Sequence, residues 1–419
     1  MLENPRFLVP FLLSLGASLT VGGQEERKEE LAPGPRAEWP QSSPTSPFIN
    51  AADYGLQLAA PAKMATEVFH ENPDCTEALQ AACDAGAGGV VYIPAGRYRV
   101  TRPIVIQTGT TVRGAGYCAT MILTEQPIPA ILHLRGVGGP MTIIRDLWTA
   151  GPVGGNWQAT GIWVQGCNGV TIRDCWVSAL GTGIRVDGIS DTWLRNIVFE
   201  LNQHGIVVEC GELGWASGNL RMFDCYGYQN YQTGITLTNC RGVQMQSCSA
   251  VGSGHAILAK NCAQVTITGA QVNWDASPWR KFGIRLEDCD HITLGNSVVE
   301  GMVEYGIAAV GCKHLTLSGN VVRHTTAGPG LIVQDCELAT VSSNNVSESA
   351  KDGVVVSGCR YLALMGNVVE TYGQDPKSDT PAAGIRVDDQ CRECEFVANL
   401  VKPVEDGGPP KVMPGQVAE

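Results

Sequence analysis

GIWVQGC, at Gly161–Cys167, recurs in nine further copies along the chain. The copies begin at Gly183, Gly205, Gly234, Ala256, Gly283, Gly306, Gly330, Gly353 and Gly384. Successive copies start 22, 22, 29, 22, 27, 23, 24, 23 and 31 residues apart. Within each copy, apolar and polar residues alternate with a period of two, which predicts a β-strand rather than a helix.

A second strand-like segment follows most copies, for example VTIRDC at Val170–Cys175 and VQMQSC at Val243–Cys248. A third, shorter apolar piece such as NVV closes the unit. One unit cannot bury its own apolar face, whereas units stacked ~4.8 Å apart bury it continuously. The pattern therefore predicts an all-β parallel β-helix of about 10–12 rungs. The signature of a leucine-rich repeat is missing, and a propeller blade needs about 40 residues.

Two further columns of residues repeat with the rungs. Eight of the sixteen cysteines occupy the same rung position: Cys167, Cys240, Cys262, Cys289, Cys312, Cys336, Cys359 and Cys391. Stacked in register, they are expected to form a column of buried free thiols, since neighbouring sulfurs are not aimed at each other and paired metal-ligand spacings are missing. Asn320, Asn344, Asn367 and Asn399 align at a turn, where inward amides can cap backbone groups.

The composition excludes several classes of protein. The 419 residues are 44% hydrophobic and only 17% charged, and they include 50 glycines without a three-residue period, so general disorder and collagen are excluded. The net charge of −12 makes nucleic acid an unsuitable partner. A polyanionic ligand would need a local basic patch or a bridging metal ion.

The ends of the chain predict its organisation. The apolar segment Phe7–Val21 is too short to span a bilayer and is typical of a signal peptide, so we predict a signal peptide at 1–23 and a secreted or periplasmic protein. No transmembrane segment is expected. A disordered linker at 24–47, the β-helix at 48–402 and a tail at 403–419 follow. Asp74 and Glu77 have the spacing of a capping box, which predicts a short helix that covers the first rung.

The N-terminal part of the β-helix carries a resemblance to a known superfamily. INAADYGLQ at Ile49–Gln57, PDCTEALQAACDAGAGGVVYIPAGRYRV at Pro73–Val100 and TTVRGAG at Thr110–Gly116 resemble the rhamnogalacturonase/epimerase type of the pectate-lyase-like superfamily. The resemblance implies a single-stranded, right-handed parallel β-helix that acts on polysaccharides. The catalytic motifs of polygalacturonases, alginate epimerases and pectate lyases are not intact here, so no catalytic residue is transferred by motif.

Strand alternation nominates a candidate site on the first strands. It places Asp187 and Glu209 on adjacent rungs about 5 Å apart, with Arg185 and Lys260 on the same face. The two acids could be the acid and nucleophile of a retaining glycosidase. They could instead bind Ca²⁺, which would neutralise a uronate while Lys260 or Arg185 serves as base or charge stabiliser. They could equally be surface acids paired with Arg185.

Two histidines are the second set of candidates. His204 and His255 each directly precede a first strand, where an imidazole could transfer protons or have a structural role.

Two longer rungs suggest the walls of a groove. Their extra residues hold Trp215, Trp274, Trp279 and Arg280, and the strand face itself adds Trp163, Arg285 and Glu287, with Tyr228 just beyond. Aromatic rings there would stack on sugars and Arg280 would contact acidic groups, or the rings would pin their own loops. Trp176 and Trp193 are interpreted as core or turn packing.

These features predict a secreted polysaccharide-processing protein, either a lyase or a glycoside hydrolase. The expected partner is a polysaccharide that can contain uronates, and Ca²⁺ is the one cofactor under consideration. The alternatives are a non-catalytic carbohydrate-binding or cell-surface scaffold, and a platform for protein partners. The sequence leaves the oligomeric state open.

Overall fold

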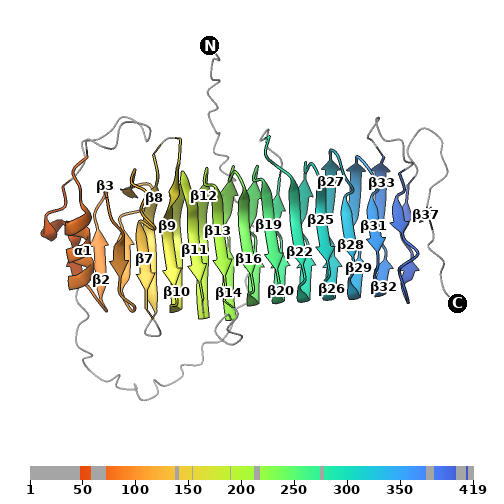
Figure 1. The fold of residues 1–419 in the computed structure, drawn as a ribbon, viewed down its shortest axis with the longest axis horizontal. Helices are drawn as coiled ribbons and strands as arrows, with labels where there is room; N and C mark the ends of the chain where they lie inside the picture. The colour runs from red at the N-terminus through yellow and green to blue at the C-terminus, as the bar shows by residue number, and fades with distance from the viewer. Residues whose placement is uncertain are drawn as a thin grey trace, which may run out of the picture. The chain divides into compact units, whose positions relative to one another are not determined.

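The computed structural model describes residues 48–57, 72–136, 141–152, 154–188, 190–211, 218–273, 278–373, 382–402 and 412–413. These residues wind as a right-handed parallel β-helix whose successive rungs lie side by side (Figure 1). Every strand pairing among them is parallel and joins the same positions of neighbouring rungs, as stacking of the repeats predicted.

The first sheet contains 13 strands and is formed by the repeated first strands. They are β4 (Ile104–Ile106), β7 (Leu132–Arg135), β9 (Asn156–Gln165), β11 (Leu180–Asp187), β13 (His204–Glu209), β16 (Thr233–Thr238), β19 (His255–Lys260), β22 (Phe282–Glu287), β25 (Tyr305–Val310), β28 (Leu331–Gln334), β31 (Val354–Ser357), β34 (Ile385–Val387) and β37 (Val412–Met413). Because β37 pairs with β34, this sheet continues into the segment 403–419 that was expected to be a tail.

The other sheet contains 24 strands in two rows. The second row holds β1 (Phe48–Asn50), β2 (Val90–Ile93), β5 (Thr111–Gly114), β14 (Gly218–Phe223), β17 (Arg241–Gln246), β20 (Ala263–Thr268), β23 (Asp290–Gly295), β26 (Lys313–Ser318), β29 (Glu337–Ser342), β32 (Arg360–Met365) and β35 (Glu395–Val397). The third row holds β3 (Gly96–Arg99), β6 (Thr120–Leu123), β15 (Tyr226–Tyr228), β18 (Ser249–Val251), β21 (Gln271–Val272), β24 (Val298–Glu300), β27 (Val321–Thr325), β30 (Asn345–Ser349), β33 (Val368–Tyr372) and β36 (Leu400–Val401). The longer strands β8 (Thr142–Ala150), β10 (Asn168–Ser178) and β12 (Ser190–Glu200) span both rows.

Single residues in the left-handed conformation turn the chain from the second row to the third. The corner residues Asp146, Asp174, Asn196 and Asp224 have φ values of 58°, 54°, 50° and 54°. Asp and Asn tolerate this conformation better than most residues with a Cβ atom. The dipeptides Asp174–Cys175, Asn196–Ile197 and Asp224–Cys225 are therefore corners, and the second residue of each is buried.

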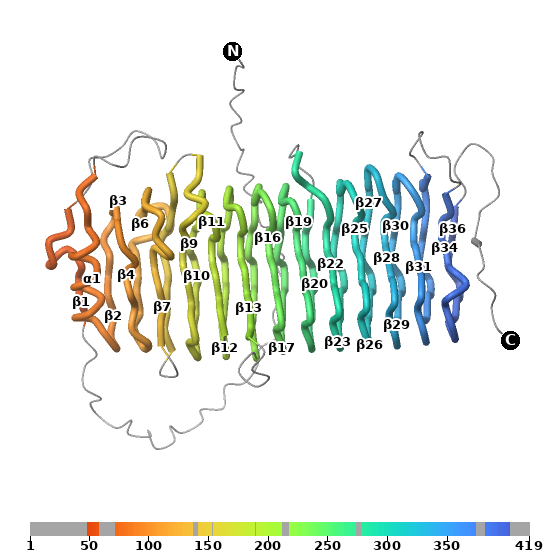
Figure 2. Tube along the Cα trace, in the orientation of Figure 1, coloured from red at the N-terminus to blue at the C-terminus, as the bar shows by residue number. Residues whose placement is uncertain are grey.

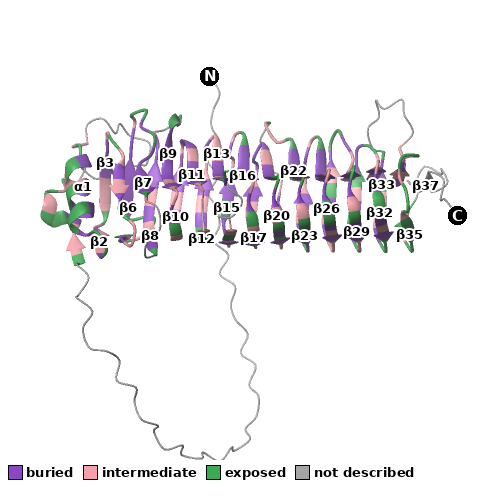
Figure 3. Cartoon of the chain, turned by 60° about the horizontal axis from the view of Figure 1, so that its bottom comes forward, coloured by how far each residue is buried: buried purple, intermediate pink, exposed green. Residues whose placement is uncertain are grey.

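The interior contains the two predicted columns, and Figure 3 shows buried residues along the strands of successive rungs. All sixteen cysteines lie among the described residues and are free thiols; Cys118 is exposed, Cys391 and Cys394 are half-buried and the rest are buried. The asparagine ladder is also confirmed. Asn320 Nδ2 donates to Asn344 Oδ1 at 3.0 Å, and Asn344 Nδ2 donates to Asn367 Oδ1 at 2.9 Å.

Helix α1 (Thr76–Ala85) follows the short 3₁₀ helix η1 (Ala51–Tyr54) and lies at the N-terminal end of the coil (Figure 2). Gln80 exchanges two hydrogen bonds with the backbone of Val105, so the helix covers the exposed edge of β4. The capping box was predicted incorrectly. Cys75 is the N-cap, while Asp74 accepts from the Thr76 backbone at 3.0 Å and Glu77 pairs with Arg102. The helices that the structure describes are too short to cross a bilayer.

Candidate functional site

Three columns of side chains follow the first sheet across its rungs. The leading column precedes the rung glycines and contains Thr182, His204, Thr233, His255, Phe282 and Tyr305. The middle column contains Trp163, Arg185, Val207, Thr236, Leu258 and Arg285. The trailing column contains Gln165, Asp187, Glu209, Thr238, Lys260 and Glu287. Neighbours within a column are register partners, about 4.8 Å apart.

The first cluster of charges centres on Arg185. Asp187 and Glu209 are register partners, as alternation predicted. The Nε atom of Arg185 lies 3.0 and 2.9 Å from the two oxygens of Asp187, and its Nη2 atom lies 3.6 Å from Oε2 of Glu209. The indole Nε1 of Trp163 donates to Asp187 Oδ2 at 2.7 Å. Both oxygens of Asp187 are thus occupied by donors, so neither is placed to give a proton to a leaving group.

This arrangement does not fit calcium. A Ca²⁺ ion takes six to eight oxygen ligands. An ion between Asp187 and Glu209 would have to displace Arg185 and break the hydrogen bond from Trp163. The residues at this position therefore form a guanidinium–carboxylate network, which was one of the interpretations that the sequence left open.

A histidine that the sequence did not nominate completes this cluster. His133, on β7, stacks on Trp163 with ring centroids 4.6 Å apart and an interplanar angle of 5°. Its Nε2 atom lies 3.2 Å from Gln165 Oε1, and burial lowers its pKa. His133 lies 28 residues before Gly161, where the first recognisable copy of the repeat begins, so the repeat did not reveal it.

The second cluster lies further along the sheet. Lys260 and Glu287 are register partners with Nζ and Oε2 3.4 Å apart, and Arg285 pairs with Glu287 and donates to the hydroxyl of Tyr305. Burial by itself would raise the pKa of Glu287. The hydrogen bond from Arg285 and the charges of Arg285 and Lys260 outweigh burial, so the pKa of Glu287 is lowered. Glu287 is therefore a carboxylate near neutral pH.

The two clusters are separated by β16, which contributes Thr236 and Thr238 to the face. Lys260 lies three rungs from Asp187, or about 14 Å. Lys260 pairs with Glu287 and does not belong to the cluster around Asp187 and Glu209.

The histidines lie in the leading column, away from the acids. His204 and Glu209 stand five residues apart on β13, or about 16 Å along the strand. His204 Nδ1 lies 2.9 Å from Thr233 Oγ1, while His255 stacks on Phe282 with centroids 4.0 Å apart. Burial lowers the pKa of His204 and, with the charge of Lys281, that of His255, so both imidazoles are neutral near pH 7. The histidines and the acids therefore stand at opposite ends of the first strands.

The predicted groove walls are described only in part. Trp215 and Trp274 lie outside the described residues. Trp279 donates its indole N–H to the carbonyl of Gly252 at 3.0 Å, and Arg280 beside it is half-buried. Tyr228, which was expected just beyond the walls as a substrate-binding residue, is the register partner of Glu200 in the third row.

An aromatic cavity of about 380 Å³ lies over the third row. Its lining consists of Met121, Trp148, Ala150, Gly151, Gly154, Gly155, Trp157, Trp176, Ser178, Ala179, Glu200, Leu201 and Tyr231. Met121 on β6, Trp148 on β8 and Trp176 on β10 are register partners on neighbouring rungs. Trp157, the second residue of β9, forms another side of the cavity.

The rings of this cavity hold one another in place. Trp148 and Trp176 are stacked with centroids 4.4 Å apart and an angle of 9°. Trp157 meets Tyr231 edge-on at 5.1 Å, and Tyr231 meets Trp279 at 4.8 Å. Trp148 Nε1 donates to Ser178 Oγ at 2.8 Å. Aromatic side chains fixed in this way present apolar faces to a ligand at little further cost in side-chain entropy.

One acidic group lies among these rings. Burial raises the pKa of Glu200, and the neighbouring indole of Trp176 opposes this shift. The Nε1 atom of Trp176 is itself buried and makes no well-aligned hydrogen bond. The cavity thus combines a predominantly aromatic surface with a polar group that can accept or donate a hydrogen bond.

Sequence comparisons connect two parts of the chain with known families. A family described as "Rhamnogalacturonase A/epimerase, pectate lyase-like" matches residues 70–131, and one described as "Periplasmic copper-binding protein (NosD)" matches residues 214–400. Each match covers less than half of the chain. No curated protein sequence matches this chain significantly.

Solved structures with the same coil cover most of the chain. The A-module of the mannuronan C-5 epimerase AlgE6 of Azotobacter vinelandii aligns with a TM-score of 0.67 and 18% identity, over 85% of this chain and 100% of that module. The AlgE4 A-module of the same organism gives 0.62 and 18%, over 84% and 100%. These likenesses show that the chain has the fold of a right-handed parallel β-helix. PfbA, a surface adhesin of Streptococcus pneumoniae, has this fold too, with a TM-score of 0.53, 14% identity and coverage of 88% and 95%.

Sequence reasoning missed the aromatic cavity of this β-helix. The tryptophans were visibly clustered in the sequence, but Trp176 was interpreted as core or turn packing. β10 continues through the corner at Asp174 into the third row and carries Trp176 outward beside Trp148. If the alternation of inward and outward residues had been restarted after Asp174, the sequence could have revealed that Trp176 points outward.

Proposed function

We propose that this β-helix binds a glycan in the aromatic cavity. The observation that carries the proposal is the combination of Trp148, Trp157, Trp176 and Tyr231 with Glu200 around one cavity of about 380 Å³. Pyranose rings have apolar C–H faces that stack on aromatic rings, and their hydroxyls hydrogen-bond to carboxyl groups. The volume lies in the range of small-ligand sites.

The net charge of the chain and the similar structures support a sugar over other ligands. A chain of net charge −12 with a carboxyl group in the cavity disfavours anionic ligands. The likeness to modules named mannuronan C-5 epimerases and to a surface adhesin is consistent with a role in carbohydrate processing or binding. The predicted signal peptide and the match to a family described as periplasmic support a location outside the cytoplasm.

The experiment is a glycan-array screen with the full chain, followed by calorimetric titration of the best ligand. Trp157→Ala and Glu200→Gln should each weaken binding about tenfold, the equivalent of ~1.4 kcal/mol for one stacked ring or one hydrogen-bonded carboxyl. Trp193→Ala is the matched control, because Trp193 is exposed, lies under Arg221 at 4.7 Å and does not line the cavity. Unchanged affinity in both cavity variants refutes the proposal.

A second candidate function is proton abstraction from a uronate at the second cluster. The neutral imidazole of His255 stacks on Phe282 and lies within electrostatic reach of Arg285. His255 would take the C5 proton while Arg285 neutralises the sugar carboxylate; the C4–O bond would break as the C4–C5 double bond forms, and water would protonate the departing oxygen. His204 would have the same role two rungs away, and Asp187, Glu209, Lys260 and Glu287 would position substrate rather than transfer protons.

Product analysis separates the two candidates. Elimination creates a carbon–carbon double bond that absorbs in the ultraviolet, and the double variant His204→Gln, His255→Gln should abolish this product without changing glycan affinity in the cavity. Hydrolysis by Asp187 and Glu209, the other sequence-based hypothesis, would instead produce new reducing ends without that absorbance. Binding without either product supports the non-catalytic scaffold.

A further inference from the structure

We propose that Asp290, His291 and His314 form a binding site for one divalent late transition-metal ion, such as Zn²⁺ or Cu²⁺. The three residues lie on β23 and β26 in the second row, away from both the first-sheet clusters and the aromatic cavity.

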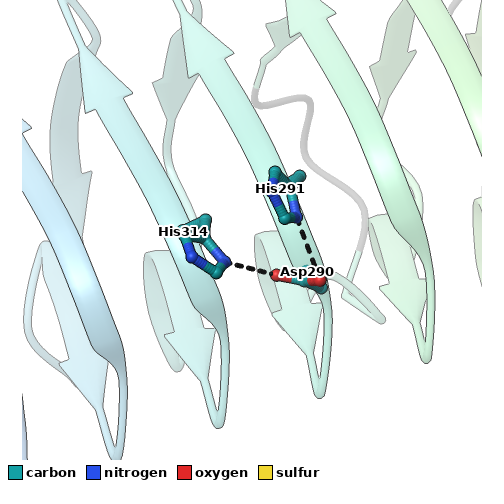
Figure 4. Close-up of side chains that lie close together, drawn as sticks. All are labelled: Asp290, His291 and His314. Atoms are coloured by element: carbon teal, nitrogen blue, oxygen red, sulfur yellow. Dashed lines mark hydrogen bonds and ion pairs between the residues drawn. The ribbon is translucent and has the colours of Figure 1, made fainter.

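The donor atoms of the three side chains converge on one point. Figure 4 shows both imidazoles turned toward the carboxylate of Asp290. His314 Nδ1 lies 2.8 Å from Asp290 Oδ1, and His291 Nδ1 lies 2.9 Å from Asp290 Oδ2. One ligand atom from each residue can be chosen so that all three lie within 4.8 Å of one another. Small rotations of these partly exposed side chains would bring them to the ~2.0–2.2 Å that Zn²⁺ requires.

The β-helix itself sets the positions of the two histidines. The register pairs Asp290 with Lys313 and Ile292 with Leu315, so His291 and His314 occupy the same position on adjacent rungs. Both have left-handed backbones, with φ values of 54° and 48°. Their rings stack with centroids 4.2 Å apart. Two imidazoles one rung apart are therefore held by the fold, and a metal ion need not order a flexible loop.

The donor set selects the class of metal. Imidazole nitrogen binds Zn²⁺ and Cu²⁺ strongly, whereas Ca²⁺ and Mg²⁺ prefer oxygen ligands. Two imidazoles and one carboxylate leave coordination positions open for water or another ligand. Lys313, next to Asp290, opposes a cation, but its Nζ atom lies 3.8 Å from Glu337, so part of its charge is compensated there.

A polar hollow of about 400 Å³ adjoins the site. It is lined by Asn219, Arg221, Gly242, Val243, Gln244, Gln264, Thr266 and His291. Since His291 belongs to both the hollow and the ligand set, the open positions of a bound ion have access to solvent. Arg221 and the amides give the hollow donors for an anionic or water ligand of the ion.

The test uses the full chain without a polyhistidine tag, in a Cys118→Ser background that removes the exposed thiol. Calorimetric titration with Zn²⁺ should give one equivalent bound, and His291→Asn and His314→Asn should each weaken it at least tenfold. Asn suits the left-handed backbone, so these variants keep the corner. His324→Asn is the matched control, because His324 also has a left-handed backbone and lies 3.3 Å from Glu348, but it does not belong to the three-residue ligand group found among the described residues.

A spectroscopic readout identifies the ligands directly. Titration with Cu²⁺ should give an electron paramagnetic resonance spectrum with coupling to two nitrogens, reduced to one nitrogen in either Asn variant. No saturable binding of either ion overturns the proposal. So does unchanged Zn²⁺ affinity in the two Asn variants, or an equal loss in His324→Asn.

Discussion

Replacement of one amide in the asparagine ladder should open the β-helix locally. Asn344 is only 2% exposed, accepts from the backbone and side chain of Asn320 at 3.0 and 3.0 Å, and donates to Leu317 O and Asn367 Oδ1 at 3.0 and 2.9 Å. Asn344→Ala removes four hydrogen bonds and leaves the buried N–H of Asn320 without an acceptor. An orphaned buried donor costs ~1–3 kcal/mol and each further lost bond about 1 kcal/mol or less. We therefore expect a loss of about 3–5 kcal/mol.

The matched control is Asn399→Ala at the half-exposed end of the same ladder. Asn399 accepts from the backbone and side chain of Asn367 and donates to Leu364 O, but water can replace these partners. Its loss should cost only about 1–2 kcal/mol.

Long repeat proteins depart from two-state unfolding, so hydrogen exchange is the appropriate assay. A loss of ~3 kcal/mol or more should reduce amide protection at least a hundredfold in peptides from β26 and β29 of Asn344→Ala. Amide protection in Asn344→Ala within threefold of the unmodified chain would refute the idea that burial makes the ladder stabilising. An equal loss of amide protection in Asn399→Ala would refute it too.

Three further predictions concern thiols, protons and packing. In the folded chain only Cys118 should react promptly with a thiol reagent, whereas all 16 cysteines should react in denaturant, as counted by absorbance. Burial lowers the folded-state pKa of His204 and His255, so their contribution to stability is present above the unfolded value of about 6.5 and is lost as pH falls below it. A variant that carries both His204→Gln and His255→Gln should lose less stability between pH 7 and pH 5, measured as a smaller change in the urea midpoint of unfolding. Gly328→Ala should abolish soluble expression because its Cβ would overlap a backbone carbonyl oxygen, while Gly211→Ala, in open space, should express normally.

The sequence predicted which residues of the candidate site face outward and which lie on adjacent rungs, but it did not predict which side chains touch. Alternation gave the outward positions of Asp187 and Glu209, and the repeat gave their adjacency. It did not show that Arg185 bridges both acids, since a side chain's rotamer depends on its neighbours. The histidines were placed on the correct sheet, yet five residues along a strand put His204 about 16 Å from Glu209.

The sequence by itself determined the coil. Apolar residues alternate with a period of two within each strand and the strands recur about every 22 residues, so the apolar faces are buried when the repeats stack as rungs. It also determined the buried thiols and the amide ladder, whose spacing equals that of the rungs. The tertiary structure alone decided which functional groups meet. Trp176 reaches Trp148 because β10 bends at Asp174, and His291 reaches His314 because successive rungs share a register. Such contacts join residues 22 or more positions apart, where local patterns carry no information about side-chain direction.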